Sequence, residues 1–397
     1  MDEISDSWPP VEVSLRQRRP GDGDSRVAAM RGAWMEVDLG AIASNVRALR
    51  RFVNRRSRVM AVVKADGYGH GASRAARLAL ASGADWLGVA TVSEALRLRE
   101  LGVHQPILLL GLVVPEACQQ ALQVDLHLTV SDPWHLEACE AAARSVGRPA
   151  HVHLKVDTGM TRVGVSLGDA SALVERIRSS EWLVLAGLET HMASGEIPGG
   201  FATSRQLERF RDLDRSLALP PEVLRHVANS ATTVNLPEAH LDMVRPGLAV
   251  YGLSPVEGDR MPFVITPAMR IVARVTQVRD VPAGVAIGYG GTFVTARPSK
   301  IALLPVGYGD GVPRALGNRE HVLVGGVPCP LVGRVSMDQC TVDVTGLEVL
   351  PGQPVTVLGR DGDREIAVTS WAEKLETIPY EIICGLGRRL PRLYVGG

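Results

Sequence analysis

Eight apolar stretches rich in Val, Leu and Ile lie between residues 58 and 252. They are RVMAVVKA (58–65), DWLGVAT (85–91), PILLLG (106–111), VDLHLTV (124–130), HVHLKVD (151–157), WLVLAGLETHM (182–192), EVLRHVANS (222–230) and DMVRPGLAVYG (242–252). Segments with helical spacing, such as ASRAARLALASG, separate most of them. Strands that alternate with helices predict a parallel sheet, and eight such units predict a closed (β/α)8 barrel like that of TIM.

The pattern changes after about residue 265, where short β runs follow one another and helical spacing nearly disappears. The runs are MRIVARVTQV, SKIALLPVGY, EHVLVGG, CTVDV and QPVTVLG, with one short helix predicted at TSWAEKLE. Gly and Pro between the runs are typical of an all-β domain. We therefore predict an α/β plus all-β chain, with the barrel over residues 33–265 and a mainly β domain over residues 266–397.

Residues 1–32 and the overall composition narrow the possible classes of protein. The first 32 residues are rich in Pro, Gly and charges, which predicts a disordered tail. The chain of 397 residues has 43 basic and 43 acidic side chains, so its charge gives no reason to expect nucleic acid or a membrane as partner. No apolar run reaches the roughly 18 residues that a spanning helix needs. The five scattered cysteines lack metal-binding spacing, so we expect a cytoplasmic protein with neither a disulfide framework nor a metal site.

Polar side chains follow six of the eight predicted barrel strands. They are Lys64, Thr91, Asp157 with Arg162 beyond it, His191, Asn229 with Ser230, and Arg245. Each alone would be unremarkable, since a single histidine or arginine is more often a satisfied structural residue. Because barrel enzymes carry their catalytic groups at the carboxyl ends of the strands, this gathering favours an active site at that mouth.

Lys64 follows a buried strand in the segment AVVKADGYGHG. Its ammonium could simply reach water at the barrel mouth. Alternatively, it could be a desolvated amine with a lowered pKa that forms a Schiff base. The segments ANSATT and RPGLAVYG follow the seventh and eighth strands, where such barrels hold phosphate groups, and Ser230 and the N–H groups near Gly247 could be donors. A Schiff-base lysine together with a phosphate site predicts pyridoxal 5'-phosphate (PLP) as cofactor.

The segment AVVKADGYGHG also resembles the cofactor-attachment motif of the alanine racemase family. Further motifs of the family follow in order: LKVDTGMTRVG, HVANSATT, RPGLAVYG, GYGGTF, PVGYGDG, RVSMDQ and PYEIICGLGRRLPRLY. The resemblance implies a PLP-dependent enzyme that interconverts L- and D-alanine and supplies D-alanine for cell-wall synthesis. It also implies a homodimer in which each active site combines one barrel with the β domain of the other subunit.

The resemblance assigns a role to each matched residue. Lys64 would bind PLP covalently and act as the base on the D face, and Tyr289 of the partner subunit would be the base on the L face. Tyr68 would contact the phosphate, with the three glycines of its motif letting the chain turn close to it. His191 would lie against the pyridine ring and Arg245 would face its nitrogen. Ser230, Gly247, Leu248 and Tyr380 would complete the phosphate and ring contacts. Arg162 and the backbone of Met337 would hold the substrate carboxylate.

Two residues need separate comment. From periodicity alone, Tyr289 cannot be preferred over Tyr308. Lys155, in HLKVDTGMTR, falls at a position where the family carries a carbamylated lysine, so we predict this modification. Neutralisation of Lys155 by Asp157 or another carboxylate, or simple solvation, are the alternatives.

Three functions remain open at this point. The first is an alanine racemase, and the second is a serine or broad-specificity racemase with the same machinery. Glu196 in HMASGEIPGG and Ser336 in RVSMDQ depart from the family pattern near the expected substrate pocket, which leaves this second possibility open. The third is a non-catalytic PLP-binding protein, against which the β domain with Tyr289 argues. Arg245 favours a racemase over a decarboxylase, because a guanidinium cannot accept the proton of the pyridinium nitrogen.

Overall fold

A computed structural model describes residues 30–256, 261–387 and 389–396 of the chain. Most of the predicted tail therefore lies outside the described residues. Arg31 belongs to its last residues, but it is bound to the β domain: its guanidinium pairs with the buried carboxylate of Asp310 at 2.7 Å. Within the described ranges, no helix is long and apolar enough to cross a membrane.

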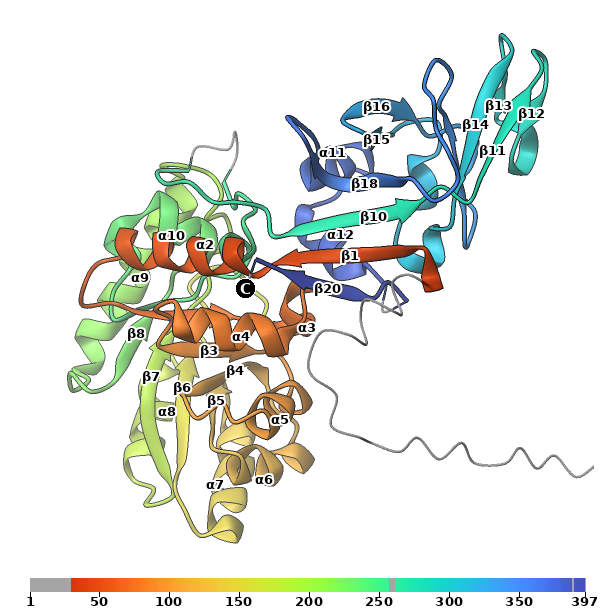
Figure 1. Ribbon diagram of the computed structural model, residues 1–397. Helices are drawn as coiled ribbons and strands as arrows, with labels where there is room; N and C mark the ends of the chain where they lie inside the picture. Colours follow the sequence, from red (N-terminus) through yellow and green to blue (C-terminus); the bar gives the residue numbers. More distant parts are fainter. Residues whose placement is uncertain (1–29, 257–260, 388, 397) are drawn as a thin grey trace, which may run out of the picture.

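The first domain is built on a parallel sheet of eight strands, one for each predicted stretch (Figure 1). The strands are β2 (Arg58–Val62), β3 (Trp86–Val89), β4 (Ile107–Leu112), β5 (Leu126–Val130), β6 (Ala150–Lys155), β7 (Leu183–Glu189), β8 (Leu224–His226) and β9 (Met243–Val244). Their order is β8-β7-β6-β5-β4-β3-β2-β9. An isolated parallel bridge between Asn229 and Arg245 joins the two ends beyond β8 and β9. The predicted barrel is thus confirmed.

Helices cover the outside of this barrel. They are α2 (Leu39–Phe52), α4 (Ala72–Ala81), α5 (Val92–Glu100), α6 (Pro115–Gln123), α7 (Pro133–Val146), α8 (Ala170–Arg178), α9 (Phe201–Leu217) and α10 (Ser230–Asn235). The short segment α3 (Lys64–Tyr68) follows β2 and is a left-handed turn. Alternation along each strand decides which side chains meet the helices. On β2, Val59 and Ala61 belong to the large core cluster, whereas Met60 packs in a separate cluster with Trp86, Leu108 and Met243. We assign this second cluster to the barrel interior.

The second domain consists of three antiparallel or mixed sheets, as the mainly β prediction expected. The largest contains β16 (Val327–Pro330), β15 (His321–Val324), β18 (Pro354–Asp361), β10 (Met269–Arg274), β1 (Ala33–Asp38), β20 (Arg392–Val395) and β19 (Arg364–Ile366). The others are β11 (Gln277–Val281), β14 (Ser299–Leu304) and β17 (Cys340–Asp343), and the pair β12 (Ala286–Ile287) and β13 (Phe293–Val294). The run MRIVARVTQV, expected to be a single strand, forms β10 and β11 in different sheets. The helix predicted at TSWAEKLE is present as α11 (Val368–Lys374).

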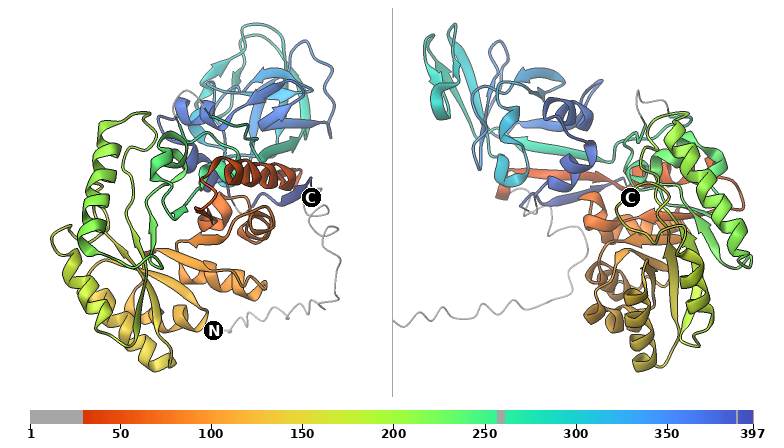
Figure 2. Two further views of the ribbon diagram at one scale, coloured as in Figure 1. Left: turned by 90° about the vertical axis from the view of Figure 1, so that its left-hand side faces the viewer. Right: turned by 180° about the vertical axis from the view of Figure 1, so that it is seen from behind.

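The first and last strands of the chain connect the two domains. Although β1 precedes the barrel in sequence, it pairs antiparallel with β10 and parallel with β20. Figure 1 shows these three strands running between the barrel and the rest of the β domain, and both views in Figure 2 place that domain at one end of the barrel. The predicted domain boundaries at residues 33 and 266 stay predictions. The finding adds that residues 33–38 lie in the sheet of the second domain.

Asn45 on α2 holds the junction between the domains. Its side chain is fully buried and makes three hydrogen bonds to backbone groups. The amide nitrogen donates to the carbonyl oxygens of Val250 (3.2 Å) and Thr266 (2.9 Å), and the amide oxygen accepts from the N–H of Thr266 (2.8 Å). Backbone groups without hydrogen-bond partners are costly when buried. This one side chain supplies partners to backbone groups of Val250 and Thr266, which lie outside the β-strands.

Replacement of Asn45 by alanine should lower the free energy of unfolding by about 2–4 kcal/mol, because the buried carbonyl oxygen of Val250 and two partly buried backbone groups of Thr266 lose their partner. Urea unfolding followed by circular dichroism would measure the change. Asn54→Ala is the matched control, since Asn54 is exposed and its side chain accepts only from the N–H of Arg56. Equal stability of the two variants would contradict this role of Asn45.

Candidate active site

The segment after β2 is a left-handed turn that begins at Lys64. Ala65, Asp66 and Tyr68 have φ angles of 51°, 54° and 51°, and Gly67 between them has 63°. Left-handed backbone costs roughly 1–2 kcal/mol per non-glycine residue, so such a turn persists only where its surroundings hold it.

Contacts from three other elements hold this turn. The carboxylate of Glu94 on α5 accepts from the N–H of Ala65 at 2.7 Å. From β20, Arg392 donates to the carbonyl oxygen of Gly69 at 2.8 Å and pairs with Asp66 at 3.2 Å. The backbone of helix α12 (Pro379–Gly385) lies against Gly69. The turn that carries Lys64 is therefore fixed by the β domain as well as by the barrel.

The glycines of this motif pack closely against other protein segments. A Cβ at Gly69 would lie 2.4 Å from the carbonyl oxygen of Ile383, and one at Gly71 would lie 2.0 Å from the hydroxyl of Tyr394. Gly67 is close to the backbone of Ala72 instead. The three glycines allow positive φ angles and close packing of protein segments, and their predicted approach to a phosphate stays a prediction.

Lys64 itself is half-buried at the carboxyl end of β2. Burial lowers the pKa of its amine, and the nearby positive charges of Arg162 and Arg245 lower it further. A lysine in this setting loses its proton more readily than one in water, which suits a nucleophile or a base.

Tyr68, Ser230 and Gly247 form a small polar cradle close to this turn. The N–H of Gly247 donates to the hydroxyl oxygen of Ser230 at 2.7 Å. A Cβ at position 247 would lie 2.4 Å from the Tyr68 hydroxyl, so glycine is needed there to leave space beside that hydroxyl. These donors, together with Leu248 at the start of the 3-10 helix η2 (Leu248–Tyr251), fit the phosphate group of PLP.

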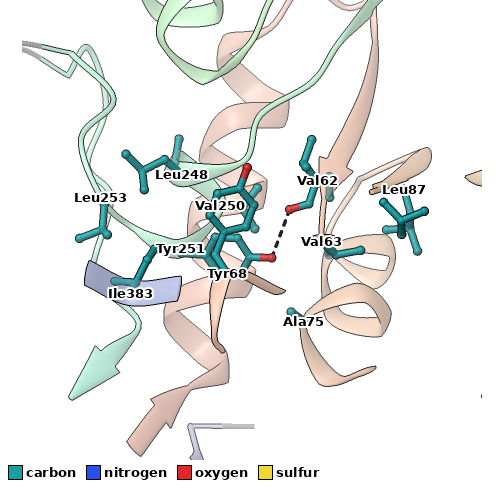
Figure 3. Close-up of a cluster of buried hydrophobic side chains, with 14 of the residues drawn as sticks. Val62, Val63, Tyr68, Ala75, Leu87, Leu248, Val250, Tyr251, Leu253 and Ile383 are labelled. Atoms are coloured by element: carbon teal, nitrogen blue, oxygen red, sulfur yellow. Dashed lines mark hydrogen bonds between the residues drawn. The ribbon is translucent and has the colours of Figure 1, made fainter. Parts of the chain in front are cut away.

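Aromatic packing fixes the Tyr68 ring. Its centroid lies 5.1 Å from that of Tyr251 and 5.8 Å from that of Tyr380, which α12 contributes from the β domain. Tyr251 in turn donates to the carbonyl oxygen of Val62 at 3.2 Å (Figure 3). Burial raises the pKa of Tyr68 above its usual range and that of Tyr380 to about 12, so both are neutral hydroxyl donors. Tyr380 and Tyr68 thus lie together, and their contacts with the cofactor stay predictions.

Arg245 is a buried cation held by the ends of two strands. Its guanidinium donates to the carbonyl oxygens of His226 (2.7 Å), Thr190 (2.7 Å) and Val227 (3.4 Å). His191 Nδ1 lies 3.4 Å from the same group. Burial lowers the pKa of His191 to about 3, helped by Arg245, so the imidazole is neutral and can stack on an aromatic ligand without carrying charge.

Three histidines extend this arrangement through the barrel. Arg245 Nη1 lies 2.8 Å from His226 Nδ1, His226 Nε2 lies 2.8 Å from His153 Nδ1, and His153 Nε2 lies 3.1 Å from His127 Nδ1. Because arginine can only donate, each histidine must accept at Nδ1 and donate from Nε2. Burial lowers the pKa of all three, which agrees with neutral rings in one tautomer. Gly187 makes room for this chain, since a Cβ there would lie 2.2 Å from His153.

Lys155 lies buried beside Glu189, a residue that the sequence analysis missed. The Lys155 ammonium is 3.8 Å from Glu189 Oε2, and Thr129 donates to Oε1 at 2.9 Å. Alternation places Glu189 on the same side of its strand as His191, two residues later, and this spacing in GLETH was the signal that could have revealed it. Asp157, the carboxylate considered for Lys155, accepts instead from backbone N–H groups of residues 159–161. Carbamylation of Lys155 stays a prediction.

Some of the polar strand ends have structural roles. Thr91 caps α5 in a capping box with Glu94, and Asn229 caps α10 by accepting from Thr232 at 2.9 Å. Asp157 closes the loop that leads to Arg162. The polar residues at the strand ends therefore indicated the correct mouth of the barrel. They did not distinguish residues that cap helices from residues that face the mouth.

Two predicted residues are exposed on the β domain of this chain. Tyr289, in the 3-10 turn η4 (Tyr289–Gly291), is 71% exposed, and Met337 is 52% exposed. Figure 1 shows the adjoining strands β12 and β13 at the end of the β domain farthest from the barrel. Arg162 is exposed at the mouth, close enough to lower the pKa of Lys64. Among the described residues, no group of three or more His, Cys, Asp or Glu side chains could hold a metal ion.

Comparison with known proteins agrees with this geometry. Residues 37–255 match the model of the alanine racemase N-terminal domain, and residues 268–394 match that of the alanine racemase C-terminal domain. The alanine racemase of Symbiobacterium thermophilum is 45% identical over 370 residues, which cover 92% of this chain and 98% of that protein.

Solved structures give the same result. The alanine racemase of Streptomyces coelicolor A3(2) superposes with a TM-score of 0.88 at 40% identity, over 93% of this chain and 99% of that one. That of Streptomyces lavendulae gives 0.87 at 40% identity, over 92% and 97%. The chain therefore belongs to the alanine racemase family, and it is an amino-acid racemase similar to these alanine racemases.

Proposed function

We propose that this protein racemises alanine with PLP bound at the barrel mouth, using Lys64 of one subunit and Tyr289 of the partner subunit as its two bases. The observation that carries the proposal is the arrangement around Lys64. A half-buried amine with a lowered pKa shares one mouth with a buried arginine and with the cradle of Tyr68, Ser230 and Gly247.

The cradle residues would hold the phosphate, and Lys64 would hold the cofactor covalently. When bound, PLP supplies a conjugated ring that makes the Cα proton of an attached amino acid acidic. His191, neutral and beside Arg245, would lie against that ring. Tyr380 and Leu248 would complete the wall around it.

Arg245 would face the ring nitrogen and keep it unprotonated. A guanidinium has no acceptor, and this one is fixed by carbonyl oxygens of Thr190 and His226. A ring without a proton on its nitrogen withdraws electrons more weakly than a pyridinium. The site would therefore limit the lifetime of the Cα carbanion and with it side reactions such as transamination.

Racemisation needs a proton to leave one face of Cα and another to arrive on the opposite face. Lys64 would exchange a proton with the D face, since its amine loses its proton readily. Tyr289 would serve the L face. It is exposed at the far end of the β domain of its own chain, so it would act on the barrel of a second subunit in a homodimer. Arg162 and the backbone of Met337 of the partner subunit would hold the substrate carboxylate between the two bases.

The cellular setting follows from this chemistry. D-alanine would be supplied for cell-wall synthesis, and five free cysteines, four of them buried, fit the reducing cytoplasm. The choice between alanine, serine and a broader range of amino acids rests on the loop with Glu196 and on Ser336. A racemisation assay across a panel of L-amino acids tests it, and we expect alanine to be turned over fastest.

The cofactor site can be tested by reduction with borohydride in the presence of PLP. The treatment should attach the cofactor permanently to Lys64, because that amine carries the lowered pKa at the cradle. Peptide mass mapping would locate the label. Lys300 and Lys374, which lie on the β domain, serve as internal controls. A label on either of them, or a protein that does not bind PLP, would end this assignment.

Replacement of Gly247 by alanine should weaken PLP binding about tenfold, equivalent to about 1.4 kcal/mol, because the added Cβ displaces the Tyr68 hydroxyl from the cradle. Titration of the apoenzyme with PLP would measure the dissociation constant. Gly168→Ala is the control, since Gly168 is exposed and its nearest neighbour is 3.8 Å from an added Cβ. Equal affinities in the two variants would show that the cradle is elsewhere.

The shared active site predicts complementation between two inactive variants. Lys64→Ala and Tyr289→Phe homodimers should both lack activity. In a heterodimer, one of the two sites would combine Lys64 of one chain with Tyr289 of the other, so a random equal mixture should recover about a quarter of wild-type activity. Native mass spectrometry would confirm that heterodimers form. Heterodimers without activity would place both bases in one chain.

A further inference from the structure

Glu189 is a carboxylate with no exposure to solvent, placed among positive charges. Its Oε2 atom lies 3.8 Å from Lys155 Nζ and 3.9 Å from Arg245 Nη1, and 3.7 Å from Nδ1 of the neutral His226. That oxygen has no hydrogen-bond partner among the described residues, while Oε1 accepts from Thr129. An ionised carboxylate persists at such a depth only where charges of opposite sign compensate it.

The strand register explains why these groups meet. Lys155 and Glu189 are paired positions on β6 and β7, and Glu189 and His226 are paired positions on β7 and β8. Side chains at paired positions of parallel strands point to the same side of the sheet, so all three lie at one level inside the barrel. The arrangement is built into the sheet and does not depend on a flexible loop.

The electrostatics agree with an ionised pair. Burial alone raises the pKa of Glu189, but Lys155 and Arg245 outweigh it and bring that pKa below its usual value. Burial lowers the pKa of Lys155, and Glu189 is the one neighbour that opposes this shift appreciably. Each group thus keeps the other charged.

From this geometry we infer that Glu189 is the built-in counter-charge of Lys155, and that Lys155 remains an unmodified ammonium in the active enzyme. This inference favours neutralisation by a carboxylate, one of the alternatives given above, over the carbamylation that the resemblance predicts. A carbamate on Lys155 would replace the ammonium by an anion and set two negative charges about 4 Å apart, where repulsion in a buried site is strong. Glu189 already supplies a negative charge beside Lys155. It is a positioning residue: it holds Lys155 and Arg245, and through them the arrangement of cations at the mouth.

The first test uses wild-type protein and ¹³C-labelled bicarbonate. Carbon-13 NMR should show no carbamate carbon on Lys155, and activity should be the same in CO₂-free and bicarbonate-containing buffer. This readout depends neither on PLP nor on the identity of the substrate, so its result is independent of the proposed function. A wild-type carbamate signal that is lost in Lys155→Met would overturn the inference.

The second test removes the counter-charge. Glu189→Ala deletes four heavy atoms, which leaves room for the three that a carbamate adds. Without Glu189, the pKa of Lys155 should fall, and its uncharged amine can then add CO₂. The nitrogen forms a bond to carbon, one C=O π bond opens to give the carboxylate, and the nitrogen proton leaves to solvent.

We expect Glu189→Ala to show the ¹³C signal that wild type lacks, with kcat lowered about 10- to 100-fold through misplacement of the mouth cations. Bicarbonate should recover part of this loss, and the conservative variant Glu189→Asp should keep most of the activity in CO₂-free buffer. Asp157→Asn is the matched control: it removes the carboxylate two residues from Lys155, which serves its own loop, and it should show no signal. A Glu189→Gln variant with wild-type kcat and KM would overturn the inference. If these variants do not fold, the wild-type spectrum alone decides.

Discussion

The buried guanidinium of Arg245 is the constraint on which the barrel mouth depends. Its backbone N–H donates to the carbonyl oxygen of Ala228 at 2.8 Å, which joins the last strand to its neighbour beyond the regular ladder. Its side chain satisfies carbonyl oxygens at the ends of β7 and β8. A charge so deeply buried must be compensated, and Glu189 supplies the opposite charge while the neutral His226 accepts a hydrogen bond from the guanidinium. Closure of the barrel and the chemistry of its mouth therefore rest on the same residue.

One part of the β domain contacts the barrel of its own chain. We propose that another part contributes to the active site of a second subunit. Within one chain, α12 and Arg392 of β20 support the left-handed turn that presents Lys64, and Tyr380 packs on Tyr68. The far end of the same domain carries Tyr289 exposed to solvent. This division explains why the first strand of the chain belongs to the second domain's sheet: it fixes the near end of that domain to the barrel.

Much of this organisation could be predicted from the sequence, and the gaps have physical reasons. The eight barrel strands were found because each is a short apolar run between helical segments. The position of β1 could not be predicted, because the pairing of residue 35 with residue 271 does not affect the local periodicity of the sequence. MRIVARVTQV was taken as one strand because the change of sheet within it involves neither Gly nor Pro. Lys64 and Arg245 stood out as charges at the ends of apolar strands. Thr91 and Asn229 stood out in the same way, although they are helix caps.

Two other site residues could not be identified from local patterns in the sequence. Tyr289 could be chosen over Tyr308 only through a resemblance, because its proposed role requires a second chain. Glu189 was hidden by the expectation that a buried strand position is apolar. Its compensation by Lys155 depends on the register of two strands more than 30 residues apart in the sequence, and that register is a property of the folded barrel.

The central claim is that two bases on opposite faces of Cα carry out the reaction, and the fate of the Cα hydrogen tests it most directly. L-alanine would be incubated with the enzyme in D₂O, and both enantiomers would be separated at low conversion and examined by mass spectrometry. Two bases predict that D-alanine carries deuterium at Cα while unreacted L-alanine keeps its proton. D-alanine that retains the original proton would mean that one base serves both faces, and it would contradict the account.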